Sequence, residues 1–349
     1  MAQADKYKIA VIGGSGYTGA DLARLAACHP HIEIKALAAK THAGKPMREV
    51  FPHLGLVDMP DLVDLDGVDW SDIDAVFCGL PHGTAQDLIA GLPEHLKIID
   101  MSADFRLRDP ETYSQWYGRS HDAQDILKTA VYGLSEHYRD EIARARLVAC
   151  PGCYPTATLL ALLPIVKAGL VDAEDLIVDA KSGVSGAGRA LKQNTLFCEV
   201  GEGLSPYAIG QHRHAPEIEQ ELSLASGAAL TVNFTPHLVP MSRGELVTCY
   251  VRLNGKTSPD DLRAELEKSY ANSQFVRVLP EGTMPATQHV RGSNYCVIGV
   301  FADRIPGRAI VIAALDNLVK GSAGQALQNF NLMVGLPESE GLEQLPLFP

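Results

Sequence analysis

The fold of the first part of the chain is decided by the stretch Tyr7-Lys8-Ile9-Ala10-Val11-Ile12-Gly13-Gly14-Ser15-Gly16-Tyr17-Thr18-Gly19. Its first six residues form an almost continuous apolar run, which is typical of a strand that is buried on both faces. A helical pattern of apolar residues begins directly after the glycines, at Leu22, Leu25 and Ala26. A strand, a glycine-rich loop and a helix in this order predict the start of a Rossmann-type parallel sheet.

The glycines of this loop predict a dinucleotide site. Their spacing is G-x-x-G-x-x-G, a variant of the fingerprint whose backbone N–H groups approach a pyrophosphate at a helix N-terminus. A tight turn without a ligand is the alternative interpretation. The candidate cofactor-binding residues here are Gly13, Gly14, Ser15, Gly16, Tyr17, Thr18 and Gly19.

The residues after the second predicted strand, 32–38, indicate which dinucleotide is bound. A site that prefers NAD usually has Asp or Glu there, because a carboxylate holds the ribose 2′-hydroxyl. This chain has Ala39-Lys40-Thr41-His42 instead, without a carboxylate. Lys40 and Thr41 therefore favour a 2′-phosphate and NADP, although a solvated basic loop could have the same composition.

Three further apolar runs, at 75–80, 97–102 and 147–149, extend this pattern to about residue 150. Ligands of such sheets bind beyond the carboxyl ends of the strands. Leu80, Pro81 and His82 are therefore cofactor candidates, although a lone loop histidine is more often structural. Ser102 and Arg106 are substrate candidates, because the planar guanidinium can clamp a phosphate or carboxylate. A salt bridge from Arg106 to a nearby acid is the alternative.

The pattern changes after residue 150. Strands are expected at 175–180, 246–253, 295–301 and 308–313, with a second glycine-rich loop at 181–189. The last two strands flank a Pro-Gly turn and read as a hairpin. We expect an α/β protein: residues 1–150 form an NADP-binding Rossmann domain that is completed by a C-terminal helix at about 317–349. Residues 151–316 then form a catalytic α+β domain on a mixed sheet.

Cys153 is the candidate nucleophile. A short strand ends in a Pro-Gly turn before it, and Pro155 suits the first position of a helix, so Cys153 lies just ahead of a helix N-terminus. The helix dipole stabilises a thiolate at this position by about 0.3–1 kcal/mol. Lowering the pKa of the thiol by one unit requires about 1.4 kcal/mol, so the dipole alone leaves Cys153 mostly protonated near pH 7. Since a free thiol titrates near pH 8.5, Cys153 needs a basic partner, normally a histidine.

His212-Arg213-His214 is the best candidate for that partner. In an extended segment, His212 and His214 face the same side. Pro216 then starts a helix with Glu217, a further substrate candidate, in its first turn. A structural role for one histidine remains open. A metal site is disfavoured, because zinc would need further ligands at recognisable spacing.

A thiol, an imidazole and a nicotinamide together predict the reduction of an acyl phosphate through a thioester. The second glycine loop, with Ser182, Gly183 and Gly186, could cradle a phosphate or line the nicotinamide, and Arg106 or Arg189 could hold an anionic substrate. The pair Cys150-x-x-Cys153 also has the spacing of a thioredoxin-like redox motif. The chain length and the N-terminal loop favour a single nucleophile.

Composition excludes several classes of partner and compartment. The chain has 349 residues, a net charge of −12 and a pI of about 5.4, so nucleic acid and anionic membranes are disfavoured partners. Seven cysteines without regular spacing favour a reducing compartment. The sequence has neither a membrane span nor a signal-peptide pattern, and we expect a cytoplasmic protein.

Over nearly its whole length the chain resembles the N-acetyl-gamma-glutamyl-phosphate reductases, a family of the aspartate-semialdehyde dehydrogenase-like superfamily. The matching motifs are Gly13–Gly19, Leu80–Gly83, Ser102–Arg106, Tyr132–Glu136, Pro151–Thr156, Ser182–Arg189, His212–His214, Pro240–Gly244 and Gly324–Asn329. The resemblance implies NADPH-dependent reduction of N-acetylglutamyl 5-phosphate to the semialdehyde in arginine biosynthesis. It also implies that Cys153 is the nucleophile and that His212 and His214 form the acid–base block, in which we prefer His212 slightly as the acid–base group. The protein is then a homo-oligomer, a dimer or tetramer, through its second domain. Asn329, in the last motif, is a further cofactor candidate.

Other functions remain open. A sister reductase could act on a carrier-bound aminoadipyl phosphate or on aspartyl phosphate, and an inactive NADP-binding regulator would be a protein of another class. Cys150 occupies a position that is usually not cysteine in this family, which raises the hypothesis that mild oxidation joins it to Cys153.

Overall fold

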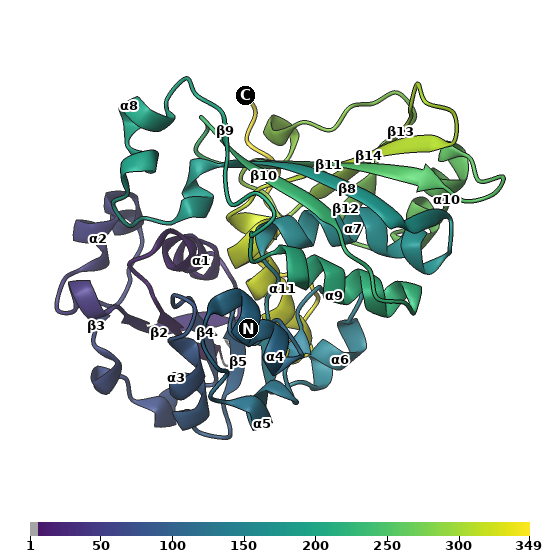
Figure 1. The fold of residues 1–349 in the computed structure, drawn as a ribbon. Coiled ribbons are helices and arrows are strands. Elements are labelled where there is room, and N and C mark those ends of the chain that lie inside the picture. The colour runs from purple at the N-terminus through teal and green to yellow at the C-terminus, as the bar shows by residue number, and fades with distance from the viewer. Residues whose placement is uncertain (1–5) are drawn as a thin grey trace. The chain divides into compact units, whose positions relative to one another are not determined.

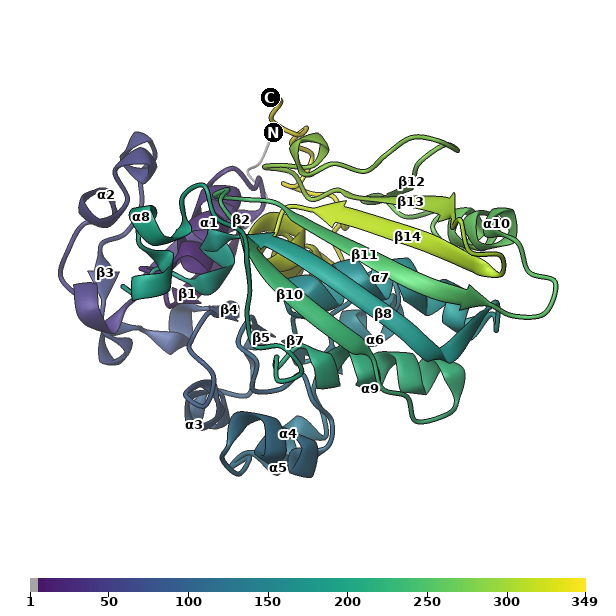
Figure 2. The ribbon, with the colours of Figure 1, turned by 45° about the horizontal axis from the view of Figure 1, so that its top comes forward.

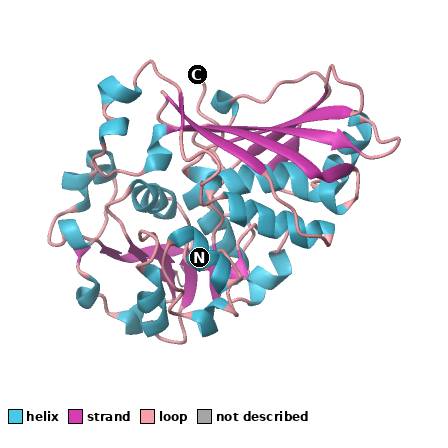
Figure 3. Cartoon of the chain, viewed as in Figure 1, coloured by secondary structure: helices cyan, strands magenta, loops and turns pink. Residues whose placement is uncertain are grey.

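A computed structural model describes residues 6–349 of the chain (Figure 1). The chain divides into two compact units. The first contains Met1–Pro151 and Ser322–Glu343, and the second contains Gly152–Gly321 and Gln344–Pro349. Each unit is built on its own sheet (Figure 3).

The first unit contains the predicted parallel sheet. Its seven strands follow the order β3-β2-β1-β4-β5-β7-β6, and every pairing is parallel. From β1, the strands β2 and β3 follow on one side and β4, β5 and β7 on the other, which confirms the Rossmann-type expectation. The strands are β1 (Tyr7–Ile12), β2 (Ile32–Ala38), β3 (Leu62–Val63), β4 (Ala75–Cys78), β5 (Lys97–Asp100), β6 (Val131–Tyr132) and β7 (Leu147–Ala149).

The helices of the first unit include one from the far end of the chain. They are α1 (Tyr17–Ala27), α2 (Met47–Val50), α3 (Ala85–Gly91), α4 (Pro110–Tyr117), α5 (Gln124–Leu127), α6 (Arg139–Arg144) and α11 (Gly324–Met333). In α11, the ring of Phe330 lies 5.6 Å from that of Phe77 in β4 and 5.7 Å from that of Tyr7 in β1. The C-terminal helix expected from about residue 317 begins later, because Val319–Ala323 form a π-helical turn.

The second unit contains a mixed sheet, as predicted. Its order is β12-β13-β14-β11-β8-β10-β9; β10 runs parallel to β8 and β12 to β13, while the other pairings are antiparallel. The strands are β8 (Val171–Gly183), β9 (Ser205–Pro206), β10 (Asn233–Val239), β11 (Glu245–Leu253), β12 (Val276–Val278), β13 (Cys296–Ala302) and β14 (Arg308–Leu315). The expected hairpin is β13–β14.

Three helices of the second unit, α7 (Cys153–Lys167), α9 (Ala215–Ser226) and α10 (Pro259–Ser269), lie on the same side of this sheet (Figures 1 and 2). The short helix α8 (Phe197–Val200) belongs to the segment that connects β8 to β9. In β11, Val247, Cys249 and Val251 are fully buried, whereas Tyr250 between them is only half-buried. This alternation separates a helix-covered face from a second, more exposed face.

One expected feature differs. The glycine-rich loop expected at 181–189 begins only after Gly183, because β8 continues to that residue and a 3₁₀ turn, Val184–Ala187, follows. All seven cysteines are thiols rather than disulfides. Within residues 6–349, no helix is both long and apolar enough to cross a lipid bilayer.

Candidate active site

Cys153 is the first residue of α7. The helix therefore begins two residues earlier than expected, and Pro155 is its third residue rather than its first. Gly152, the N-cap, is extended (φ −64°, ψ 158°) and contributes no side-chain cap. The Cys153 thiol thus belongs to a helical first turn, where the helix dipole favours an anion. Gly321 makes room for it, since a Cβ atom there would lie 2.8 Å from the Cβ of Cys153.

His214 lies directly against the residue that precedes the nucleophile. A Cβ atom on Gly152 would overlap the imidazole of His214 and lie only 2.6 Å from its Cε1 atom. His214 is the N-cap residue of α9. In the first turn of the same helix, the buried Glu217 accepts the N–H of Gly152 through Oε1 at 2.8 Å. The starts of α7 and α9 are therefore held together at Gly152.

His212 occupies a different environment from His214. Its ring lies 5.7 Å from that of Tyr154, 5.3 Å from Tyr207 and 5.4 Å from Phe234. Burial, with a smaller contribution from the charge of Arg213, lowers the pKa of His212 to about 4. His212 is therefore neutral near pH 7, and its geometry favours a packing role.

The expected extended conformation of 212–214 is wrong. These residues form a turn in which the N–H of His214 donates to Nδ1 of His212 at 3.1 Å. The two imidazoles still lie close together, with ring centroids 4.7 Å apart. Because Gly152 contacts His214, the geometry favours His214 over the slight preference for His212 that the sequence suggested.

The end of β8 contributes the second group of candidates. Ser182 is buried, and Gly183 approaches another backbone so closely that a Cβ atom would lie 2.9 Å from the carbonyl oxygen of Met241. A Cβ atom on Gly186 would meet the Ser182 hydroxyl at 3.3 Å. Arg189, beyond them, is exposed. Ser182, Gly183 and Gly186 form a tightly packed backbone region at the carboxyl end of β8, and the exposed Arg189 follows it.

Glu245 is a residue of this region that the sequence interpretation missed. It is fully buried and pairs in register with Ser182. The predicted strand began one residue too late, at 246. Extending the alternation of Val247, Cys249 and Val251 back by two residues would have placed an acidic side chain in the buried phase of the strand, and that was the available signal.

The first unit holds the glycine-rich loop at the carboxyl end of β1. Gly13 has φ +82°, and a Cβ atom there would overlap the carbonyl group of Gly79, with its carbon 2.9 Å away. A Cβ atom on Gly19 would lie 2.8 Å from Cα of Gly14. Gly16 caps α1 without a side chain, and the first turn has no acidic residue. This cradle fits a pyrophosphate at a helix N-terminus.

We expect Gly13→Ala to destabilise the first unit and weaken dinucleotide binding. The added methyl group combines a strained φ with the overlap at Gly79, and the expected cost is about 2–4 kcal/mol. Thermal unfolding and dinucleotide titration measure it. Gly44→Ala is the matched control, because Gly44 has φ +81° but no atom within 4 Å of the added Cβ. Equal losses in both variants would show that strain, and not the overlap, decides the effect.

The other cofactor candidates of the first unit lie at the same edge of its sheet. Lys40 and Thr41 are exposed in a 3₁₀ turn directly after β2. Leu80, Pro81 and His82 follow β4. His82 is exposed, with its ring 5.7 Å from that of Tyr117.

Arg106 and Ser102 are engaged with neighbouring protein groups. The Nε of Arg106 donates to the carbonyl oxygen of Cys150 at 2.8 Å, and Nη2 donates to that of Met101 at 3.2 Å. Ser102 donates its hydroxyl to Asp100 at 2.9 Å. Burial raises the pKa of Asp100 to about 7. Arg106 therefore ties together the carboxyl ends of β5 and β7, whatever else it binds.

Asn329 and Cys150 lie in the interior of the first unit. The amide of Asn329 donates to the carbonyl oxygen of Gly133 at 2.8 Å and contacts the Cys150 sulfur at 3.6 Å. Its oxygen accepts the Ser135 hydroxyl at 2.6 Å. Burial raises the pKa of Cys150 to about 12. Cys150 is thus held as a neutral thiol, which does not favour the oxidation hypothesis.

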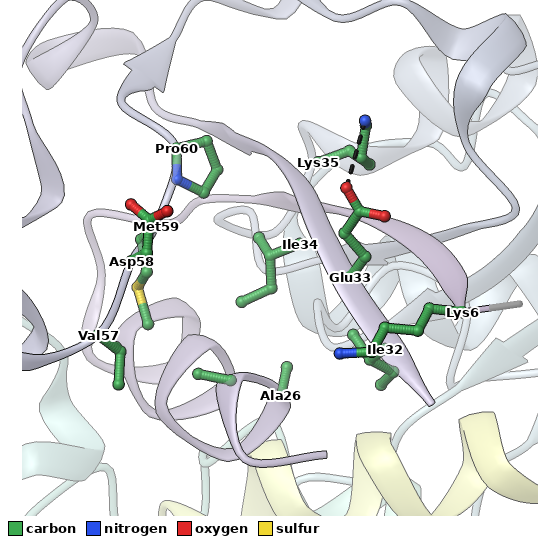
Figure 4. Close-up of a pocket in the computed structure, with 11 residues that line it drawn as sticks. Lys6, Ala26, Ile32, Glu33, Ile34, Lys35, Val57, Asp58, Met59 and Pro60 are labelled. Atoms are coloured by element: carbon green, nitrogen blue, oxygen red, sulfur yellow. Dashed lines mark ion pairs between the residues drawn. The ribbon is translucent and has the colours of Figure 1, made fainter. Parts of the chain in front are cut away.

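A surface pocket of the first unit lies away from these residues (Figure 4). It is lined by the end of α1, including Ala26, and by the start of β2, including Ile32 and Lys35. These segments form the amino end of the sheet, opposite the carboxyl end that carries the glycine loop. No predicted site residue lines this pocket. Among residues 6–349, no cluster of three or more His, Cys, Asp or Glu side chains could hold a metal ion.

Comparisons with known proteins match both units. Residues 8–145 match the family model described as the NAD binding domain of semialdehyde dehydrogenase, and residues 153–317 match its dimerisation domain. An N-acetyl-gamma-glutamyl-phosphate reductase of Rhodospirillum rubrum is 54% identical over 99% of both chains. The chain belongs to the N-acetyl-gamma-glutamyl-phosphate reductase family. The resemblance seen in the motifs is thereby confirmed, as is the expectation of an oxidoreductase with a nicotinamide cofactor.

This family extends to plants, and its fold extends further. A probable chloroplastic N-acetyl-gamma-glutamyl-phosphate reductase of Arabidopsis thaliana is 53% identical over 98% of this chain and 85% of its own. Among solved structures, aspartate semialdehyde dehydrogenase II of Vibrio cholerae matches with a TM-score of 0.71, at 17% identity, over 95% of this chain and 99% of its own. That likeness confirms the two-unit fold.

Proposed function

We propose that this chain uses NADPH to reduce N-acetylglutamyl 5-phosphate to N-acetylglutamate 5-semialdehyde, a step of arginine biosynthesis. The observation that carries the proposal is the position of Cys153 as the first residue of α7, next to a glycine that His214 covers. The names of the relatives that are more than 50% identical over nearly the whole chain support the substrate. His214 is the proposed acid–base group, and His212 packs behind it.

The first half of the reaction forms a thioester on Cys153. His214 accepts the thiol proton, and the sulfur attacks the acyl carbon. The bond from that carbon to the phosphate oxygen breaks, and phosphate leaves. The N–H groups of the first turn of α7 stabilise negative charge at this position. The Gly152–Glu217 hydrogen bond holds the turn and α9 in register, so that the imidazole and the thiol keep their places.

The second half releases the aldehyde. Bound NADPH supplies a hydride to the thioester carbon. The carbon–sulfur bond then breaks, the carbonyl group forms again, and His214 returns the proton to the departing sulfur. The glycine loop Gly13–Gly19 holds the pyrophosphate in this proposal, and Lys40 with Thr41 holds the 2′-phosphate.

Phosphate-dependent reduction of NADP tests the substrate. The purified chain is offered N-acetylglutamate semialdehyde, aspartate semialdehyde or aminoadipate semialdehyde with phosphate and NADP. We expect turnover with the first and at least about 100-fold lower kcat/KM with the others, since the site must recognise the N-acetyl and carboxylate groups. A preference for another aldehyde would indicate a sister reductase, and absence of turnover with all three would indicate a regulator.

We also propose that two copies associate through the more exposed face of the second sheet. Ile177, Tyr250, Ile310 and Phe301 form a row across β8, β11, β14 and β13, because neighbours in this row are partners in register. All four side chains are only half-buried. A contiguous apolar row on an uncovered sheet face is typical of an interface, and the family model for this unit is a dimerisation domain.

Tyr250→Asp is expected to dissociate this oligomer. A charge in the centre of the row would be buried without a partner in the interface, which costs several kcal/mol. Light scattering during size-exclusion chromatography measures the mass of each variant. Tyr250→Phe, which keeps the ring, should keep the mass of the unchanged protein. If the Asp variant keeps it too, the interface lies elsewhere.

We place the protein in the cytoplasm. Seven thiols without a disulfide fit a reducing compartment, and the proposed reaction consumes NADPH. Localisation of a tagged chain by cell fractionation checks this assignment.

A further inference from the structure

Glu245 opens β11, and its side chain is fully buried. It shares the face of Val247, Cys249 and Val251, which is the face that α7 covers. Cys153 is the first residue of α7. An acidic group is therefore buried on the side of the sheet against which the helix of the nucleophile packs.

The surroundings of this carboxyl group do not compensate for its burial. Among the described residues, none other than Cys153 offers a hydrogen bond to either of its oxygens. Burial raises the pKa of Glu245 to about 8, while hydrogen bonding with the side chain of Cys153 opposes this shift. A buried carboxyl group with so little support lowers stability, so its presence calls for a role in the site.

Cys153 is the group whose side chain is hydrogen-bonded with Glu245. The other titratable groups that interact with Glu245 are Tyr154 on α7, Tyr207 after β9 and Asp316 after β14. Burial raises the pKa of both tyrosines, so they stay neutral near pH 7. Asp316 lies 3.6 Å from Nη1 of Arg243, and its charge adds to the raised pKa of Glu245. Of these neighbours, the Cys153 thiol is therefore the one that is hydrogen-bonded with Glu245 and can exchange a proton with it.

We propose that Glu245 is a second proton-exchanging group at the nucleophile, and that its carboxyl group and the Cys153 thiol share one proton. When the proton moves from sulfur to the carboxylate, an S–H bond breaks and an O–H bond forms. The resulting carboxylic acid donates a hydrogen bond to the thiolate, and no electrons are transferred. His214 then exchanges protons with the pair. The inference rests on the proposed function only in taking Cys153 as the nucleophile.

A shared proton has a measurable consequence. A carboxylate and a thiolate side by side repel each other, so the pair loses its second proton at a higher pH than the first. The thiolate of the unchanged protein should therefore appear in two steps as the pH rises. Glu245→Gln cannot share a proton in this way, and its Cys153 should titrate in one step.

Alkylation of Cys153 by iodoacetamide tests the proposal without any substrate. The rate is followed by mass spectrometry of the Cys153 peptide between pH 5 and 10, in the unchanged protein, Glu245→Gln and Glu245→Met. We expect two steps in the unchanged protein and one step in Glu245→Gln. Alkylation of Glu245→Met should be roughly tenfold slower at pH 7, because the thiolate loses a hydrogen bond. Profiles that superimpose for the unchanged protein and Glu245→Gln overturn the proposal.

The chain contains its own controls. Cys198 is exposed and serves as a reference thiol, while Cys249 in β11 is fully buried and should stay unreactive unless a variant loosens the strand. If Cys153 reacts no faster than Cys198 at pH 7 in the unchanged protein, the proposed nucleophile itself is wrong. If Cys153 is alkylated faster than Cys198 but the pH profile of Glu245→Gln equals that of the unchanged protein, only the shared proton is refuted.

Thermal unfolding provides a second readout. The pKa of Glu245 is higher in the folded chain, at about 8, than its ordinary value of 4.5. The folded state then binds the proton more tightly, so this group lowers stability as the pH rises from about 4.5 to 8. In Glu245→Met, stability should no longer fall between pH 4.5 and 8 on account of this group. At pH 8 the variant should therefore unfold at the same or a higher temperature than the unchanged protein. A variant that is less stable at every pH would indicate a structural role and count against the proposal.

Discussion

Cys153→Ala abolishes reduction of the acyl phosphate, with an expected loss of kcat on the order of 10⁴-fold or more, as when other covalent nucleophiles are removed. The physical reason is that Cys153 is the thiol at the start of α7, next to the glycine that His214 covers. The other thiol of the C-x-x-C sequence, Cys150, is buried and has a raised pKa of about 12. Initial rates of NADPH oxidation measure the effect. Mass spectrometry of protein mixed with acyl phosphate alone should show an acyl adduct in the unchanged protein and none in the variant.

Cys198→Ser is the control for this variant. Cys198 is exposed in the short helix α8, so its replacement should leave both the rate and the adduct unchanged. Retention of more than a tenth of the activity in Cys153→Ala would rule out covalent catalysis through this residue.

Gly152→Ala is expected to lower kcat by about 10²- to 10³-fold while the chain stays folded. The backbone angles of Gly152 (φ −64°, ψ 158°) suit alanine, so the change adds no backbone strain. Its methyl group would instead occupy the place of the His214 imidazole. Displacing an acid–base group by about 1 Å has effects of this size. Steady-state kinetics measure the loss, and circular dichroism checks the fold.

Non-additivity separates this explanation from a general disturbance. If Gly152→Ala acts by moving His214, it should cause little further loss in a His214→Ala background. A double variant whose loss equals the product of the two single losses would show that the glycine matters for another reason, such as the hydrogen bond from its N–H to Glu217.

Local patterns were sufficient to predict much of the fold. The bounds expected for β1 and β2 agree with those observed. The nearly continuous apolar run of β1 ends in glycines, and β2, in which the charged Glu33 and Lys35 alternate with apolar residues, ends at a basic turn. The mixed second sheet could also be expected, since its hairpin has a Pro-Gly turn. The start of α7 was misplaced because Pro155 is tolerated anywhere in a first turn, not only at its first position.

The parts that could not be predicted depend on contacts between distant residues. Sequence alone treats His212 and His214 alike. The contact of His214 with Gly152 and the packing of Tyr207 and Phe234 around His212 distinguish them. Likewise, the neighbouring residues Arg243 and Gly244 do not distinguish Glu245 from an ordinary charged residue. Its importance depends on α7 covering that end of β11.

The contact between Gly152 and His214 also constrains how this sequence can change over time. A side chain at position 152 and an imidazole at position 214 exclude each other in space, so neither position can drift independently. In related chains the two positions should covary: glycine at the first wherever histidine stands at the second, and larger residues at the first only where that histidine has been lost. This pair can therefore help to recognise relatives that keep the fold but have given up the reaction.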